Sequence, residues 1–242
     1  RDLHTAYRRQ RQMCIRDRRE LDLRNEIQGA ELLQTKAEEV GVQFPMPLLK
    51  FPKVWPELSN KHVLVMEHIK APTLESRLSD KDLSWEDLLQ LFRIHGAYMF
   101  GIGTFHGDLH PGNAMVDENG MFTFIDTGAI SRAPESVRSA LFGFFYYLAK
   151  GELEEAFEAM LTMADTPPTG EAKARYMQEM HETYDGFVGK SVSEVSLTQQ
   201  MMKTVRIAVL AGCRFGEEAF PIIRSLMYMD GMVPVSYTHL TL

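Results

Sequence analysis

The sequence predicts a mixed α+β fold, in which remnants of a small sheet-containing lobe (residues 19–70) precede a mainly helical lobe (residues 71–234). Two patterns predict strands. The run at 63–69 is short, β-branched and bounded by turn residues, as in a buried strand, and two short apolar runs flank Asn119-Gly120, as in a β-hairpin. In the second half, apolar residues recur at helical spacing, which predicts that this part is helical.

The composition suits a globular protein, since 45% of the 242 residues are hydrophobic. The formal net charge of -7 argues against a nucleic-acid binder, because such a protein needs an excess of Lys and Arg on one face. Cys14 and Cys213 are too few for a disulfide framework and favour a reducing compartment. The richest apolar stretch, 140–149, is about half as long as the ~20 residues that a membrane-spanning helix needs.

Several helices can be placed from local signals. Apolar residues among charges predict an amphipathic helix over 20–40 that stops at a glycine. Ser84 followed by Asp87 is typical of a capping box and predicts a helix that runs to about Gly101. Two further helices are expected at 137–150 and 153–164.

The residues that carry chemistry surround the hairpin. A hairpin brings its two ends together, so the loop before it, with Asp108 and Asn113, is expected to meet Asp126 just after it. Mg²⁺ prefers carboxylate and amide oxygens, and phosphoryl transfer needs a metal-bound nucleotide and a carboxylate that orients the acceptor. The offset from Asp108 to Asn113 equals that between the base and the metal-binding Asn of the protein-kinase catalytic loop. Asp108, Asn113 and Asp126 are therefore the candidate catalytic residues.

These motifs resemble those of the UbiB (AarF-type) family of atypical, protein kinase-like kinases. HGDLHPGN followed by FIDTGA is similar to the family's HADPHPGN and IDFG segments. Residues 56–69 resemble its strand pair before the nucleotide hinge, and ELDLRNE (20–26) resembles its Glu-x-Asp motif with a helix glutamate. Residues 138–161 and 220–231 resemble its helical half. The resemblance covers about 19–234 and implies a protein kinase-like fold with a truncated small N-lobe and a mainly helical C-lobe.

By this resemblance Asp108 would be the catalytic-loop aspartate, and Asn113 and Asp126 would be the Mg²⁺ ligands, with ATP and Mg²⁺ as cofactors. Asp126-Thr127-Gly128 stands in the place of Asp-Phe-Gly, and Thr127 leaves the packing normally given by Phe in question.

The resemblance also implies nucleotide-binding residues. Glu26 would pair with a strand lysine, and Glu20 and Asp22 would be an acidic pair near the nucleotide. The gatekeeper and the adenine-contacting hinge would be Met66, Glu67, His68 and Ile69.

A kinase-type site also needs a glycine-rich cover over the phosphates and a lysine that reaches them. Residues 1–28 contain neither Gly nor Lys, and the family's Lys-x-Gly-Gln segment is absent. We therefore expect negligible turnover from this chain.

Both ends carry unusual strings. MCIRDR (13–18) and VSYTHLTL (235–242) resemble translated sequencing-adapter bases, so 1–18 and 235–242 are expected to be non-native ends. The Arg-rich start would then be an artefact rather than an arm for anionic lipid or nucleic acid.

The leading interpretation is an atypical kinase-like ATPase or phosphotransferase. By resemblance alone, it would support isoprenoid quinone (ubiquinone) biosynthesis, with ATP and either an isoprenoid lipid or quinone-biosynthesis proteins as partners, and with no nucleic acid. The expected location is the cytoplasm, with peripheral association at the inner membrane in the full-length protein.

Three other functions stay open at this point. A small-molecule phosphotransferase of the aminoglycoside or choline kinase type also uses loops like HGDLHPGN. A metal hydrolase would use His106, Asp108 and His110, although no second ligand cluster matches it. A catalytically silent pseudokinase would be a scaffold in a membrane-bound biosynthetic complex.

Overall fold

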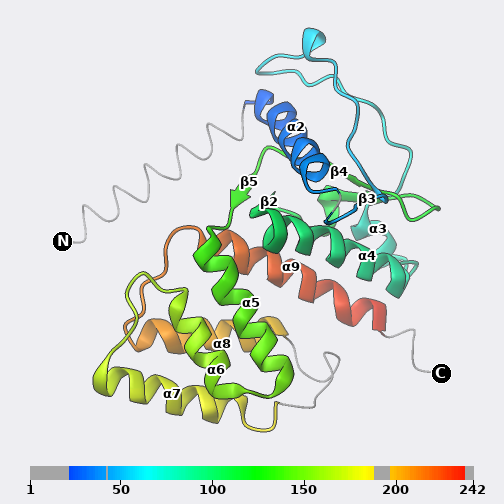
Figure 1. Cartoon of the computed structure of the whole chain (residues 1–242). Coiled ribbons are helices and arrows are strands. Elements are labelled where there is room, and N and C mark those ends of the chain that lie inside the picture. Colours follow the sequence, from blue (N-terminus) through cyan, green and yellow to red (C-terminus); the bar gives the residue numbers. More distant parts are fainter. Residues whose placement is uncertain (1–21, 42, 188–196, 238–242) are drawn as a thin grey trace.

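The computed structural model describes residues 22–41, 43–187 and 197–237. Two small sheets and the first described helix lie at one end, and a group of helices forms the other end (Figure 1). The helices are α2 (Arg24–Glu39), α3 (Leu74–Ser79), α4 (Trp85–Gly96), α5 (Glu135–Lys150), α6 (Leu153–Thr162), α7 (Gly170–Tyr184), α8 (Leu197–Leu210) and α9 (Ala219–Tyr237). The strands are β1 (Leu49–Lys50), β2 (Thr104–His106), β3 (Ala114–Val116), β4 (Phe122–Phe124) and β5 (Ile130–Arg132).

The predicted hairpin is confirmed as β3 and β4, which pair antiparallel with Ala114 opposite Phe124. Its turn closes at Gly120, whose φ of 73° lies in the left-handed region that favours glycine. β1 adds a third strand parallel to β4, with Leu49 opposite Phe122. The hairpin is fully buried at several positions and therefore forms a rigid base for the loops at its open end.

A second sheet joins the same loops from the other side. β2 pairs antiparallel with β5, and His106 lies opposite Ile130. The Gly107 amide donates to the Ala129 carbonyl over 2.6 Å. The loop after β2 is thus held against the segment between β4 and β5, both by the strand pairing and by the hydrogen bond from Gly107 to Ala129.

The prediction of a buried strand at 63–69 is wrong. Within the described chain, the longest pairing of this run is a short one with residues 53–55. Met66 lies opposite Val54, and backbone hydrogen bonds flank this pair on either side. Val63 is 47% exposed, and none of the seven residues is buried. Apolar composition indicates a tendency to extend, whereas burial requires a sheet or helix on both faces, which the described neighbours do not supply here.

The helix predicted to begin after Ser84 is confirmed as α4. The Ser84 side chain accepts from the Asp87 amide while the Asp87 carboxylate accepts from the Ser84 amide, a complete capping box at the start of α4. The helix continues as a π-helical turn, Ala97–Ile102, and ends at Gly103 with φ 77°. This π turn delivers the chain directly into β2.

Replacing Ser84 by Ala is expected to lower the free energy of unfolding by about 1 kcal/mol, because one amide of the first turn loses its acceptor. Urea unfolding measures the change. Ser139→Ala, on the exposed face of α5, is the matched control, for which we expect a change of no more than about 0.5 kcal/mol. An equal loss in both variants would contradict a capping role for Ser84.

The helical end is held by aromatic packing. The helices predicted at 137–150 and 153–164 are confirmed as α5 and α6. α5 packs along α6, and α7 and α8 lie next to them (Figure 1). Phe144, Phe157 and Tyr184 are buried together, with the Phe157 and Tyr184 rings 5.3 Å apart. α9 then runs back beside α4 and α3, which brings it to the sheet end.

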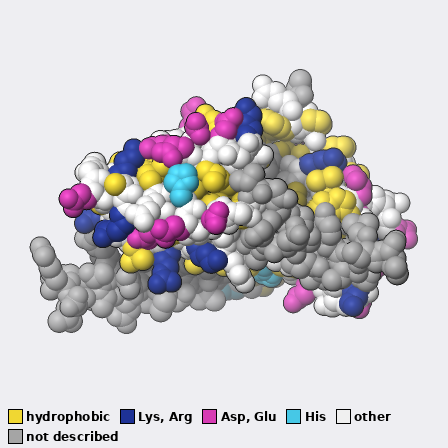
Figure 2. All heavy atoms as spheres, turned by 90° about the horizontal axis from the view of Figure 1, so that it is seen from below, with side chains coloured by type: hydrophobic (Ala, Val, Ile, Leu, Met, Phe, Trp, Pro, Cys, Tyr) yellow, Lys and Arg dark blue, Asp and Glu magenta, His cyan; other side chains and the backbone are white. Residues whose placement is uncertain are grey.

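Charges on the lower face are mixed rather than separated. Figure 2 shows acidic and basic side chains interspersed around apolar ones over the described part of this face. The described helices include none with both the length and the apolar character required to cross a bilayer.

Candidate active site

His106 holds the loop that carries Asp108 and Asn113. Its Nδ1 accepts from the Asp108 amide over 3.2 Å, so its other nitrogen, Nε2, carries the proton and donates to the Ile125 carbonyl over 3.0 Å. Burial lowers the pKa of His106, which keeps the ring neutral. The ring therefore ties the loop after β2 to the end of β4, as the hairpin geometry predicted.

Asn113 is buried between the two aspartates. Its Nδ2 donates to the Asp108 carbonyl oxygen over 3.0 Å and lies 3.3 Å from Asp126 Oδ2, while its own carbonyl accepts from the Ile125 amide. With the amide nitrogen occupied, the side-chain oxygen Oδ1 remains as an acceptor. Amide and carboxylate oxygens are the ligands that Mg²⁺ prefers.

Asp126 lies two residues after the end of β4 and has a left-handed backbone, with φ 54°. Non-glycine residues rarely adopt this conformation, and such strain concentrates at functional sites. The following Thr127 is buried, and its hydroxyl donates to the Glu26 carbonyl oxygen over 2.8 Å. Thr127 thus supplies a hydrogen bond to α2 at the position where the related motif has Phe packing.

Glu26 completes the contact between α2 and the Asp126 segment. Its Oε2 accepts from the Gly128 amide over 2.9 Å. Burial, together with the nearby negative charge of Asp126, raises the pKa of Glu26 to about 7. Within the described ranges no Lys or Arg forms an ion pair with this carboxylate, so the structure does not test the predicted lysine partner.

The Asp108 side chain is held by α9, which the sequence reasoning did not connect with the site. The Tyr228 hydroxyl donates to Asp108 Oδ1 over 3.2 Å, and the Arg224 guanidinium lies 3.6 Å from the same oxygen. Tyr228 follows Asp108 by 120 residues. No local sequence pattern predicts such a contact, because it depends on how α9 packs against the end of the molecule that carries the sheets.

The remaining predicted nucleotide residues lie apart from this group. Glu20 lies outside the described residues. The Arg24 guanidinium hydrogen bonds to Asp22 and lowers its pKa to about 2, at the start of α2. In the part of the chain that is described, Met66, Glu67, His68 and Ile69 make no hydrogen bond or ion pair with Asp108, Asn113 or Asp126. Their hinge role stays a prediction.

The geometry disfavours a metal hydrolase. Both ring nitrogens of His106 are engaged with backbone groups, and His110 Nδ1 accepts from the Gly112 amide over 3.0 Å. Three or more His, Cys, Asp or Glu side chains do not converge on a common metal position anywhere in the described residues.

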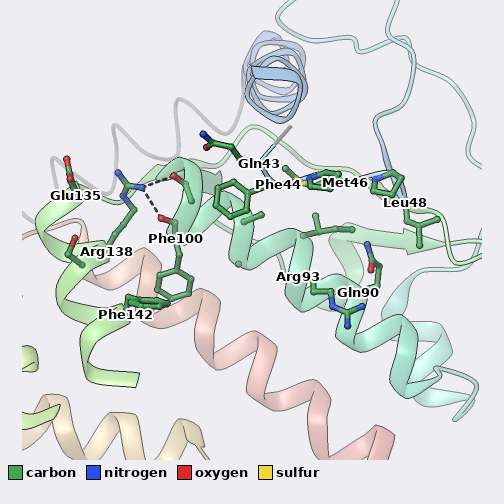
Figure 3. A pocket seen from close by; sticks show the side chains of 17 residues that line it. Gln43, Phe44, Met46, Leu48, Gln90, Arg93, Phe100, Glu135, Arg138 and Phe142 are labelled. Carbon is green, nitrogen blue, oxygen red and sulfur yellow. Dashed lines mark hydrogen bonds between the residues drawn. The ribbon is translucent and has the colours of Figure 1, made fainter. Parts of the chain in front are cut away.

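A separate pocket lies between the loop at 43–48, α4 and the start of α5 (Figure 3). Its volume is about 840 Å³, and Phe44, Phe100 and Phe142 line it. The Arg138 guanidinium closes one end by donating to the carbonyls of Phe100 and Gly101. None of the predicted site residues lines this pocket, so it is distinct from the Asp108 site.

The fold and the loop geometry define a protein of the kinase-like class. More narrowly, the profile of the ABC1 atypical kinase-like domain matches residues 5–160, and the chain belongs to this family. The match confirms the resemblance to UbiB/AarF kinases and the kinase-like fold.

Related proteins agree with this assignment. A "Probable protein kinase UbiB" of Histophilus somni is 26% identical over 235 residues, which are 93% of this chain and 41% of that protein. "Protein ACTIVITY OF BC1 COMPLEX KINASE 8, chloroplastic" of Arabidopsis thaliana is 27% identical over 161 residues, 64% of this chain and 20% of that protein. The chain thus spans about two fifths of the length of the UbiB relative.

A solved structure shares the fold. The Rv3197–erythromycin complex from Mycobacterium tuberculosis superposes with a TM-score of 0.54 at 17% identity, covering 94% of this chain and 59% of that one.

Proposed function

We propose that the chain carries the phosphate-handling half of a Mg-ATP-dependent, UbiB-type phosphotransferase or ATPase. Asp108 is the base that orients the acceptor, and Asn113 and Asp126 are the metal ligands. The observation that carries the proposal is the placement of the Asn113 amide between the Asp108 carbonyl and the Asp126 carboxylate. This contact brings the Asn113 amide group and the Asp126 carboxylate within 3.3 Å of each other.

Each side chain of the site has a separate proposed role. Asn113 and Asp126 would hold Mg²⁺ through their side-chain oxygens. When bound, ATP would supply the phosphoryl group and Mg²⁺ would offset part of its negative charge. The neutral ring of His106 keeps the loop at a constant distance from the Asp126 segment. Asp108, about one third exposed, is open to accept a hydrogen bond from a hydroxyl acceptor or water.

The wider role follows from the family resemblance. We propose that the whole protein supports isoprenoid quinone biosynthesis, acting with an isoprenoid lipid or with quinone-biosynthesis proteins, from the cytoplasm and peripherally at the inner membrane. A proposed N-lobe (19–70) and C-lobe (71–234) would contribute the hinge residues Met66–Ile69 and the catalytic loop respectively, with Glu20 and Asp22 near the nucleotide.

Calorimetric titration with Mg-ATP tests the metal role. We expect the wild-type chain to bind Mg-ATP. Asp126→Ala should lose at least tenfold in affinity, because it removes the carboxylate from the two proposed protein ligands of the metal. The matched control is Asp82→Ala, which removes a 75% exposed carboxylate between α3 and α4 and is expected to leave binding unchanged. Equal affinity in wild type and Asp126→Ala contradicts the proposal.

A second candidate is a nucleotide-responsive scaffold. It is favoured by Glu26, whose carboxylate accepts from the Gly128 amide where an active kinase requires pairing with lysine. Phosphate release tests the scaffold, since a scaffold binds Mg-ATP without hydrolysing it. Little release is expected from this chain under either function, so only a positive result separates them. Sustained hydrolysis by this chain that is lost in Asp108→Asn would exclude the scaffold.

A further inference from the structure

Two side chains of α9 reach the Asp108 carboxylate, and we infer that Arg224 and Tyr228 are positioning residues that hold this aspartate in one orientation. The inference rests on the proposed role of Asp108 as the base. Both α9 groups approach the same oxygen, Oδ1, at 3.2 Å for the Tyr228 hydroxyl and 3.6 Å for the Arg224 guanidinium. The second carboxylate oxygen, Oδ2, is thereby left for the acceptor.

α9 contacts the loop that carries Asp108 at several atoms. Arg224 and Tyr228 are four residues apart, so they project from the same face of the helix. A second guanidinium nitrogen of Arg224 donates to the Gly107 carbonyl, the residue just before Asp108. The Tyr228 ring packs edge-on against His110, with centroids 6.1 Å apart, just after Asp108. The helix therefore contacts the loop before, at and after the aspartate.

A positioning role follows because, apart from α9, the bonds to Asp108 fix its backbone and not its side chain. Its amide and carbonyl are fixed by His106 and Asn113, but these bonds leave the side-chain torsion χ1 free. An aspartate side chain on a loop has three staggered positions open to it, and a base acts only from the one that faces the acceptor. The α9 donors select one of these positions.

The rotamer of Asp108 can be read by NMR on chain labelled with ¹³C and ¹⁵N in aspartate. The three-bond couplings from Asp108 Cγ to its own amide nitrogen and carbonyl carbon report χ1. We expect values of a single rotamer in wild type, and values averaged over rotamers in the double variant Arg224→Met, Tyr228→Phe. Tyr228→Phe alone keeps the ring and removes only the hydroxyl, so it should give intermediate couplings and remains informative if the double variant unfolds.

The matched controls are Arg93→Met on α4 and Tyr146→Phe on α5, which make the same chemical changes at more exposed positions. Couplings of Asp108 should stay at wild-type values in both. Unchanged Asp108 couplings in Tyr228→Phe and in a folded double variant would overturn the inference. Averaging at Asp117 as well, an aspartate fixed in the hairpin turn, would also overturn it, since that outcome shows general loosening.

Mg-ATP affinity separates this inference from the proposed function. Because the α9 pair acts on Asp108 rather than on the proposed metal ligands, Tyr228→Phe should keep the dissociation constant within about twofold of wild type. A loss as large as that of Asp126→Ala would overturn the positioning role. Failure of wild-type chain to bind Mg-ATP would instead refute the proposed function, and the coupling result would then show only how the loop is held.

Discussion

Gly29→Ala is expected to lower the free energy of unfolding by about 3 kcal/mol, which corresponds to roughly 6–12 °C in Tm for a chain of this size. A Cβ at position 29 would lie 1.9 Å from the Thr127 carbonyl oxygen, a backbone atom that no side-chain rotation can remove. α2 would have to move away from the Asp126 segment, which also pulls Glu26 from the Gly128 amide. Thermal unfolding followed by circular dichroism measures the shift, and faster hydrogen exchange at Gly128 would locate it.

The matched control is Gly96→Ala in α4. A Cβ there meets no atom within 4 Å, and alanine is the better helix former, so the variant should be as stable as wild type or up to about 1 kcal/mol more stable. If Gly29→Ala behaves like this control, α2 does not lie against Thr127 as described and Glu26 is not held at the site.

Glu26→Gln is expected to stabilise the protein at pH 8 and to leave it unchanged at pH 4. The folded state raises the pKa of Glu26 from its usual 4.5 to about 7, so between these values the folded chain holds a proton that the unfolded chain has released. The stability associated with this proton is fully present below about pH 4.5 and is lost as the pH rises through about 7. Gln stays neutral throughout and can still accept from the Gly128 amide.

Urea unfolding of both proteins from pH 4 to pH 8, with EDTA to exclude metal ions from Asp126, measures the effect. Because the carboxylate is partly open to solvent, the gain at pH 8 should be on the order of 1 kcal/mol. Glu31→Gln, at an exposed position of the same helix, is the control and should follow the wild-type curve. Parallel curves for wild type and Glu26→Gln would show that the Glu26 carboxylate is not confined next to Asp126.

Local chemistry predicted the elements that depend on neighbours in the sequence. The capping box of Ser84 and Asp87 and the hairpin around Gly120 both form as expected, since each is decided by hydrogen bonds within a few residues. The meeting of Asn113 and Asp126 follows from the hairpin alone. These parts of the site were therefore open to sequence reasoning.

Elements that depend on distant partners were predicted less well. The run at 63–69 has the composition of a buried strand, but none of its residues is buried, because burial depends on what covers a strand. β1, a pair of residues parallel to β4, has no pattern long enough to detect. The contacts of Arg224 and Tyr228 with Asp108 join positions more than a hundred residues apart, which no spacing rule connects.

The family and the order of the loop, the hairpin and the aspartate could be predicted from the sequence, because they depend on residue types at short and fixed spacings. Three contacts emerged from the folded structure instead: the Gly128 amide donates to Glu26, α2 approaches Thr127 closely at Gly29, and α9 reaches Asp108. Such contacts depend on the packing of whole helices against the sheets. That packing is set by the summed burial of many side chains and leaves no mark at any one position.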